Sequence, residues 1–171
     1  MDIQHQVHPI PPLYDASSEV LVLGSFPSQK SRESNFFYGH PQNRFWRVMS
    51  AILNEELPES VDDKKNMLLK HNVAVWDVIA SCDIKGSSDS SIVNVVPNDI
   101  EKILLHTNIK NIFVNGKTAY KLYKKYTEPK IHMNAVCLPS TSPANAAWSE
   151  KRLIEEWRAV SECLGLNNIN F

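Results

Sequence analysis

Residues 19–49 place the strongest constraint on how this chain can fold. Residues 20–23 form a short, uninterrupted run of Val and Leu, which is typical of a strand buried on both faces of a parallel sheet. The run ends at Gly24, Ser25, Phe26 and Pro27, where the glycine permits unusual backbone angles and the proline prevents the strand from continuing. Because open α/β sheets bind ligands at the carboxyl ends of their strands, we expect this turn to lie at a binding site.

The following loop is unusually rich in flat side chains. Residues 36–46 hold six aromatic or imidazole rings within eleven positions, together with Asn43 and the breakers Gly39 and Pro41. Loop aromatics beside breakers tend to face clefts, so Phe37 and Tyr38 are expected to stack on a flat ligand. The alternative is that rings of this loop pack in the hydrophobic core. This is the simpler explanation for Phe45 and Trp46, which open the next helix.

Short apolar runs alternate with amphipathic segments along the rest of the chain. We expect strands at 20–23, 72–80, 110–115 and 135–138, and helices at 44–53, 62–70, 97–105, 117–126 and 148–164. This alternation predicts a doubly wound parallel sheet with helices on both faces. Residues 1–18 are expected to form an extended lead-in over one sheet edge, and residues 82–91 a loop long enough to touch a ligand. A length of 171 residues predicts one domain over residues 1–171.

The four strand exits should converge, because the carboxyl ends of parallel strands lie at one edge of the sheet. They carry amides, hydroxyls, a carboxylate and an indole suited to recognising a polar, planar group, with little provision for nucleophilic attack by the protein. The residues expected there are Gly24, Ser25, Phe26, Pro27, Trp76, Asp77, Asn115, Ser140, Thr141, Ser142 and Pro143.

Several classes of protein lack their usual motifs in this chain. It has no Gly-x-Ser-x-Gly elbow, no Walker A loop and no Gly-x-Gly-x-x-Gly fingerprint. The six histidines show no helical metal spacing, and the three cysteines show no Cys-x-x-Cys spacing, so we expect no metal and no disulfide. The absence of a signal sequence and of a long apolar run predicts a cytoplasmic protein that does not enter a membrane. A net charge of −1 neither favours nor excludes nucleic-acid binding.

Taken together and in order, three segments resemble motifs of the uracil-DNA glycosylase superfamily. They are Gly-Ser-Phe-Pro-Ser at 24–28, Phe-Tyr-Gly-His-Pro-Gln-Asn-Arg-Phe-Trp at 37–46 and Leu-Pro-Ser-Thr-Ser-Pro-Ala-Asn-Ala at 138–146. Segments 75–78, 94–99 and 113–117 extend the resemblance, which covers roughly residues 19–160. Within the superfamily the chain most resembles the hypoxanthine-DNA glycosylases, also called DNA-deoxyinosine glycosylases.

The resemblance implies a three-layer α/β/α fold with a central four-stranded parallel sheet. It also implies a monofunctional enzyme, without metal or cofactor, that hydrolyses the N-glycosidic bond of a base flipped out of damaged DNA. Asn43 then corresponds to the catalytic residue, and Phe37 or Tyr38 would stack on the base. Ser28 and the segment 140–143 would contact DNA, the latter through amides and hydroxyls that grip phosphates. We expect the enzyme to act as a monomer.

This chain differs from other branches of the superfamily at two motif positions, and these differences indicate which base it acts on. Mismatch-specific uracil-DNA glycosylases have a catalytic Asn where this chain has Phe26, and several branches have a His where it has Leu138. The missing groups favour hypoxanthine over uracil as the substrate.

Alternative hypotheses remain open from the residues alone. Asn43 could simply cap the helix that follows it, and Asp77 could either cap its turn or supply the missing carboxylate. Excision of uracil from mismatches and non-catalytic binding of DNA or purines are the competing functions.

Overall fold

The apolar run after Glu19 forms β2 (Val20–Gly24), an inner strand of a four-stranded parallel sheet. The computed structural model describes residues 2–165, and the strand order in this sheet is β3-β2-β6-β7. The partners of β2 are β3 (Val73–Asp77) and β6 (Asn111–Asn115), and β7 (Ala135–Leu138) pairs with β6. Gly24 lies opposite Asp77 in the register, so the ends of β2 and β3 meet at the same edge.

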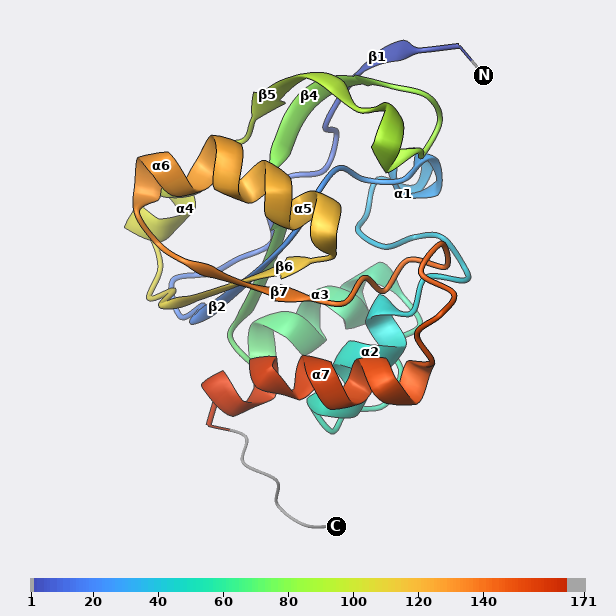
Figure 1. The fold of residues 1–171 in the computed structure, drawn as a ribbon. Coiled ribbons are helices and arrows are strands. Elements are labelled where there is room, and N and C mark those ends of the chain that lie inside the picture. The colour runs from blue at the N-terminus through green and yellow to red at the C-terminus, as the bar shows by residue number, and fades with distance from the viewer. Residues whose placement is uncertain (1, 166–171) are drawn as a thin grey trace.

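Alternating side chains of β2 enter two separate cores because successive residues of a strand point to opposite faces. Val20 and Val22 pack with α2 (Phe45–Ile52), α3 (Val61–Lys70) and α7 (Glu150–Cys163). Leu21 and Leu23 pack on the other face with α4 (Ile100–Leu105) and α5 (Lys117–Leu122). Figure 1 shows the two helical layers on either side of the sheet, which confirms the predicted three-layer α/β/α fold.

The strand predicted at 72–80 is in fact two strands in two different sheets. β3 ends at Asp77, and β4 (Ile79–Ile84) belongs to an antiparallel sheet of order β1-β4-β5, with β1 (Gln4–Val7) and β5 (Val93–Pro97) on its two sides. Only Val78 separates them, and its N–H donates to the Gly24 carbonyl at 2.9 Å. The prediction was wrong because the segment contains no glycine or proline that would mark the change of sheet.

The N-terminal lead-in covers the edge of the parallel sheet, as predicted. Leu13 and Val75 of edge strand β3 exchange two backbone hydrogen bonds, of 3.0 and 2.9 Å. The lead-in also supplies β1, which the sequence analysis did not predict. The loop expected at 82–91 is shorter than predicted, since its first three residues complete β4 and its end forms the short helix η1 (Asp89–Ser91).

The remaining helices differ from expectation mainly at their ends. A short helix that was not predicted, α1 (Gln29–Ser34), follows the Pro27 turn. The helix expected at 117–126 is instead α5 followed by the π-helical η2 (Tyr123–Thr127) and α6 (Glu128–Ile131). Within residues 2–165, none of the helices combines the length and the apolar character needed to cross a bilayer.

Candidate functional site

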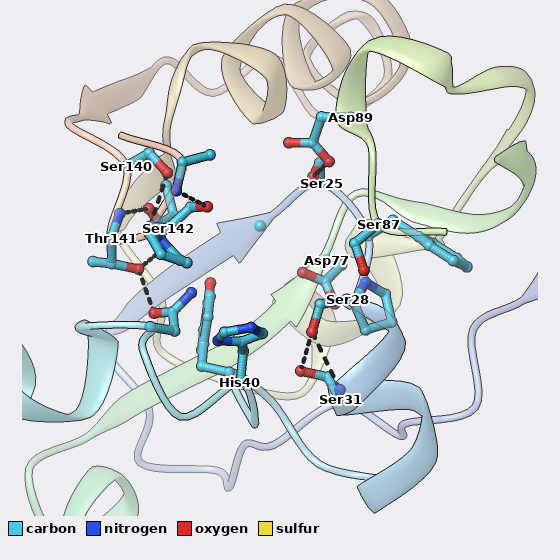
Figure 2. Close-up of a pocket in the computed structure, with 18 of the residues that line it drawn as sticks. Ser25, Ser28, Ser31, His40, Asp77, Ser87, Asp89, Ser140, Thr141 and Ser142 are labelled. Atoms are coloured by element: carbon cyan, nitrogen blue, oxygen red, sulfur yellow. Dashed lines mark hydrogen bonds between the residues drawn. The ribbon is translucent and has the colours of Figure 1, made fainter. Parts of the chain in front are cut away.

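A pocket of about 510 Å³ opens where the parallel strands end. Its volume lies within the usual range for sites that bind small organic groups. Ser140, Thr141 and Ser142 lie on one side of it, and Asp77, Ser28 and Ser87 lie on the other (Figure 2). The lining residues are Gly24, Ser25, Phe26, Pro27, Ser28, Ser31, Phe37, Tyr38, His40, Asn43, Asp77, Ser87, Ser88, Asp89, Ser90, Asn115, Ser140, Thr141, Ser142, Pro143 and Ala144. The predicted convergence of the strand exits is confirmed.

Asn43 is held at the pocket by hydrogen bonds to its side-chain oxygen. The Phe45 N–H and the Thr141 hydroxyl both donate to Asn43 Oδ1, each at 2.9 Å. Asn43 therefore supports the start of α2, as the capping interpretation expected, and also lines the pocket. Its Nδ2 makes no hydrogen bond to any described residue, so the group that remains for a ligand is a donor.

Asn115 fixes Thr141 from the end of β6. Thr141 N–H donates to Asn115 Oδ1, and Asn115 Nδ2 donates to Thr141 Oγ1, both at 3.0 Å. Since Thr141 Oγ1 accepts this bond, its own proton is directed to Asn43. The result is a one-way chain of hydrogen bonds, from Asn115 through Thr141 to Asn43, that sets the orientation of the Asn43 carboxamide.

Arg44 anchors the segment that carries Thr141. Its guanidinium donates to the carbonyls of Ser142 at 2.9 Å, of Asn145 at 3.1 Å and of Trp148. The Arg44 N–H also donates to the Thr141 carbonyl at 3.1 Å. These bonds join two segments about a hundred residues apart and leave the hydroxyls of the 140–143 segment at the pocket wall.

Tyr38 forms part of the aromatic wall in a constrained conformation. Its ring stacks on Phe45 with centroids 3.9 Å apart, and its φ of 52° lies in the left-handed region. The hydroxyl is buried without a hydrogen-bond partner among the described residues. Burial, followed by the nearby Asp77 charge, raises the pKa of Tyr38, so the phenol stays protonated. An unpartnered polar atom in a strained residue is typical of a functional site.

Phe37 contributes less surface to the pocket than predicted. It is only 2% exposed and packs edge-on against Phe36 in the core. Its carbonyl accepts the indole N–H of Trp46 at 3.2 Å, which fixes the loop. Phe45 and Trp46 are buried in the core, as the simpler explanation for these two rings expected.

Two carboxylates, Asp77 and Asp89, lie in the pocket wall. Asp77 is 4% exposed, and its Oδ1 crowds Gly24 so closely that a Cβ there would lie 2.4 Å from it. Asp89 Oδ1 accepts the Ser25 hydroxyl at 3.2 Å. Burial raises the pKa of Asp89, and the Asp77 charge adds to this effect, against the lowering by the Ser25 hydrogen bond.

Trp76 is the one predicted site residue that the structure places outside the pocket lining. Its side chain lies at the edge of the sheet, where the indole N–H donates to the Ile10 carbonyl at 3.1 Å. The prediction that Trp76 lines the ligand site was wrong because alternate strand residues point to opposite faces, and Asp77 occupies the pocket side. The hydroxyl of Ser28, which was assigned to DNA, accepts the Ser31 N–H at 3.2 Å and caps α1 at the pocket rim.

Several pocket residues were not singled out from the sequence. They are Ser31, His40, Ser87, Ser88, Asp89, Ser90 and Ala144. The Ser-rich loop had been expected to reach a ligand, but no spacing identified its individual members. Residues 2–165 contain no cluster of three His, Cys, Asp or Glu side chains placed to hold a metal ion.

Known proteins are similar to this chain over most of its length. The family model of the uracil DNA glycosylase superfamily matches residues 11–162. A hypoxanthine DNA glycosylase of Methanosarcina acetivorans is 35% identical over 152 residues, which cover 88% of this chain and 94% of the relative. A hypoxanthine DNA glycosylase of Methanosarcina barkeri is 31% identical over 109 residues, covering 63% of this chain and 69% of that protein.

A solved structure is similar over nearly the whole fold. The NMR structure of a candidate uracil DNA glycosylase from Methanosarcina acetivorans superposes with a TM-score of 0.79 at 30% identity. The match covers 91% of this chain and 96% of the solved one.

Proposed function

The chain belongs to the uracil-DNA glycosylase superfamily, and from this premise we propose that it is a monofunctional DNA glycosylase that releases hypoxanthine from deoxyinosine in DNA. Two relatives that carry the name hypoxanthine DNA glycosylase support this substrate. The enzyme would work as a monomer in the cytoplasm and would take the damaged base in an extrahelical position. Flipping costs a few kcal/mol and is easiest for a mispaired base.

The orientation of Asn43 is the observation that carries the proposal. Hydrolysis of an N-glycosidic bond builds negative charge on the departing base and positive charge on the sugar. With Oδ1 taken by Phe45 and Thr141, Asn43 can present only its N–H groups to a ligand. A fixed amide donor stabilises the charge that develops on the leaving purine, and a carboxamide cannot act as a general base near neutral pH.

The pocket walls suit a flat bicyclic base. Tyr38 offers a ring held rigid by its stacking on Phe45, and stacking of a base on an aromatic ring stabilises binding by roughly 1–3 kcal/mol.

Contacts to DNA would come from the pocket rim. The 140–143 segment presents hydroxyls and backbone amides, which are suited to phosphate oxygens. Arg44 holds this segment in a fixed shape before DNA arrives, so little ordering would be needed on binding. Ser28 lies across the pocket from it, where it can contact the other side of an extruded nucleotide (Figure 2).

The substrate preference follows from what the first and last motifs lack. Phe26 places an apolar ring where other branches carry a polar catalytic residue, and Leu138 is buried in the core rather than facing the pocket. Without a histidine at position 138 to stabilise a uracil anion, the remaining donors favour a purine.

A base-release panel tests the proposal. Purified protein is incubated with duplex and single-stranded oligonucleotides that carry hypoxanthine, uracil, xanthine or ethenoadenine, and abasic sites are then cleaved with alkali. We expect cleavage at hypoxanthine and little at uracil. Asn43→Ala should lower the single-turnover rate about 100- to 1,000-fold, the usual cost of losing one fixed donor to a developing charge. Asn66→Ala, at an exposed position of α3, is the matched control and should leave the rate unchanged.

The panel also decides between the competing functions. Preferential cleavage at uracil would support mismatch-specific uracil excision, which is favoured by the description of the solved NMR structure. Absence of turnover on every base, with DNA binding retained, would contradict the glycosylase proposal and support a non-catalytic binder.

A further inference from the structure

A buried histidine and a buried aspartate meet directly behind the pocket. His8 of the lead-in lies with Nε2 at 2.7 Å from Asp77 Oδ2, and the two side chains are only 3% and 5% exposed. An isolated carboxylate at this depth would be strongly disfavoured, so a donor must compensate its loss of solvation. We refer to this contact as the His8–Asp77 pair.

The hydrogen bonds of His8 fix its tautomer. The Ile10 N–H donates to His8 Nδ1 at 3.2 Å, so Nδ1 carries no proton. The imidazole proton is therefore on Nε2, and it is donated to Asp77 Oδ2. A neutral imidazole thus faces an ionised carboxylate, and Asp77 presents a negative charge to the pocket.

The surroundings hold His8 in this position. Its backbone N–H donates to the Ala80 carbonyl at 2.8 Å. The rings of Phe26 and Trp76 meet the imidazole edge-on, with centroids 5.9 and 6.1 Å away. Trp76 also holds the Ile10 carbonyl, so this residue, although outside the pocket, fixes the turn that places His8.

The second oxygen of Asp77 is the one available to a ligand. Oδ1 lies against Gly24 in the pocket wall and makes no hydrogen bond to any of the described residues. Asp77 is thus an acceptor with one oxygen fixed by His8 and the other facing the ligand space. Asn43 contributes only donors to the same pocket, so the two side chains are chemically complementary.

We propose that Asp77 is a catalytic residue of the glycosylase and that His8 is its positioning residue, an inference that rests on the proposed function. The C1′–N9 bond breaks and its electron pair leaves on the base, while a water oxygen forms the new bond to C1′. Asp77 stabilises the cationic sugar and accepts the proton that this water loses. The base takes a proton from solvent, and Asp77 returns its own to solvent.

The titratable groups around Asp77 agree with this role. They are His8 from the lead-in, Tyr38 from the aromatic loop and Asp89 from η1. Burial raises the pKa of both Tyr38 and Asp89, and the Asp77 charge adds to each shift. Tyr38 therefore stays a neutral donor, and the raised pKa of Asp89 reflects its burial beside the Asp77 charge.

Asp77→Asn tests the catalytic role, because it keeps the shape of the side chain and removes its charge. The single-turnover release of hypoxanthine should fall by roughly 100- to 10,000-fold, the range for general acid–base catalysis, while affinity for the uncleaved duplex persists. Asp83→Asn is the matched control. Asp83 pairs with His5 at 2.9 Å on the neighbouring strands β4 and β1, but this pair is solvent-exposed and outside the pocket, so its rate should equal that of the wild type.

The pH–rate profile tests the positioning role of His8. In His8→Ala the buried carboxylate loses its donor and is protonated at higher pH, so the acidic limb of the profile should move to higher pH. His8→Gln keeps an amide donor near the Nε2 position and should restore much of the wild-type profile. If His8 had only a structural role, the His8→Ala substitution would lower the rate by the same factor at every pH.

The outcomes separate this inference from the proposed function. A wild-type protein without turnover on any base removes the proposed function itself. An active wild type whose Asp77→Asn variant matches the Asp83→Asn control overturns the inference alone. If Asp77→Asn does not fold, as judged by circular dichroism, the His8 variants provide the test. An acidic limb of the pH–rate profile that does not move in His8→Ala then overturns the inference about Asp77 and His8.

Discussion

At the scale of single residues, the site depends on side chains that have one oxygen or nitrogen fixed and another available. Asn43 uses Oδ1 for Phe45 and Thr141 and keeps its amide donors. Asp77 uses Oδ2 for His8 and keeps Oδ1. This division prepares the site before substrate arrives, so little reorganisation is needed during reaction.

Thr141 should control the activity of Asn43 without touching the base. Thr141→Val keeps the volume but removes the hydroxyl that orients Asn43 and accepts from Asn115. We expect a rate loss of about 100-fold, typical of a misplaced catalytic group, and a stability loss of about 1–3 kcal/mol from the unpaired amide. Single-turnover kinetics and urea denaturation measure the two effects. Thr107→Val, remote from the pocket, also removes a bonded hydroxyl and should change stability only.

Gly24 should not tolerate even one methyl group. A Cβ at this position would lie 2.4 Å from Asp77 Oδ1, which cannot rotate away because Oδ2 is bound to His8. Gly24→Ala should therefore displace Asp77, lower the rate and cost about 1–3 kcal/mol of stability. In Gly39→Ala the new methyl meets the rotatable Ser34 hydroxyl instead. A Gly24→Ala variant as active as Gly39→Ala would contradict the tight packing described here.

The sequence located most residues of the site but not their partners. Strand ends can be read from apolar runs followed by breakers, which is how Gly24, Asp77 and Asn115 were identified. Asp89 was missed because its Ser-rich loop lacks any periodic pattern. His8 was missed because its contact with Asp77 spans 69 residues, and no local rule predicts such a pairing.

At the scale of elements, the main surprise is the change of sheet at Val78. Apolar periodicity located the four parallel strands, although the second was predicted too long, and most of the helices that cover them. It could not show that β3 and β4 belong to different sheets, since only Val78 separates the two strands and no glycine or proline marks the change. The smaller sheet is what brings the lead-in to the back of the pocket.

An exposed polar cluster should make the packing of α3 depend on pH. Glu55, which follows α2, accepts from Lys70 at 2.7 Å and lies 2.9 Å from His71 Nε2, at the end of α3. The Lys70 hydrogen bond, and then that of His71, lowers the pKa of Glu55 below its ordinary value. The ionised carboxylate therefore adds stability above the ordinary Glu range, and this contribution is lost as the pH falls through the lowered pKa.

Glu55→Gln measures this contribution. The variant should be less stable than the wild type at about pH 7, by less than about 1 kcal/mol because the pair is exposed. The difference should shrink as the pH falls through the lowered pKa of Glu55. Urea denaturation over a descending series of pH values tests this, and a difference that grows on acidification would contradict it. Glycosylase activity should be unchanged, since Glu55 lies outside the pocket.

At the scale of the whole molecule, the pocket is assembled from segments spread over most of the chain. His8, Gly24, Asn43, Asp77 and Thr141 come from five separate segments, and the two cores hold them in register. The C-terminal helix takes part through Trp157, whose indole N–H donates to the Pro139 carbonyl at 2.9 Å. The 140–143 segment is thus tied to α7 as well as to Arg44.

Trp157→Phe should lower both the stability of the core and the rate of the reaction in the pocket. It removes the Pro139 hydrogen bond and part of a fully buried ring, so we expect a loss of about 1–3 kcal/mol in stability. The rate should fall modestly because the 140–143 segment loses one support. Trp148→Phe, at a partly exposed ring, is the matched control. Equal rates for the two variants would show that α7 does not influence the site.

The hydrogen bond from Thr141 to Asn43 has a consequence for biogenesis. It joins positions 98 apart in the chain, and such distant contacts form late because a long loop must first close. A growing polypeptide that has not yet emerged beyond its second-last strand lacks Thr141, so only the Phe45 N–H holds the Asn43 side-chain oxygen. We therefore expect the Asn43 amide to gain its full support only at the end of folding.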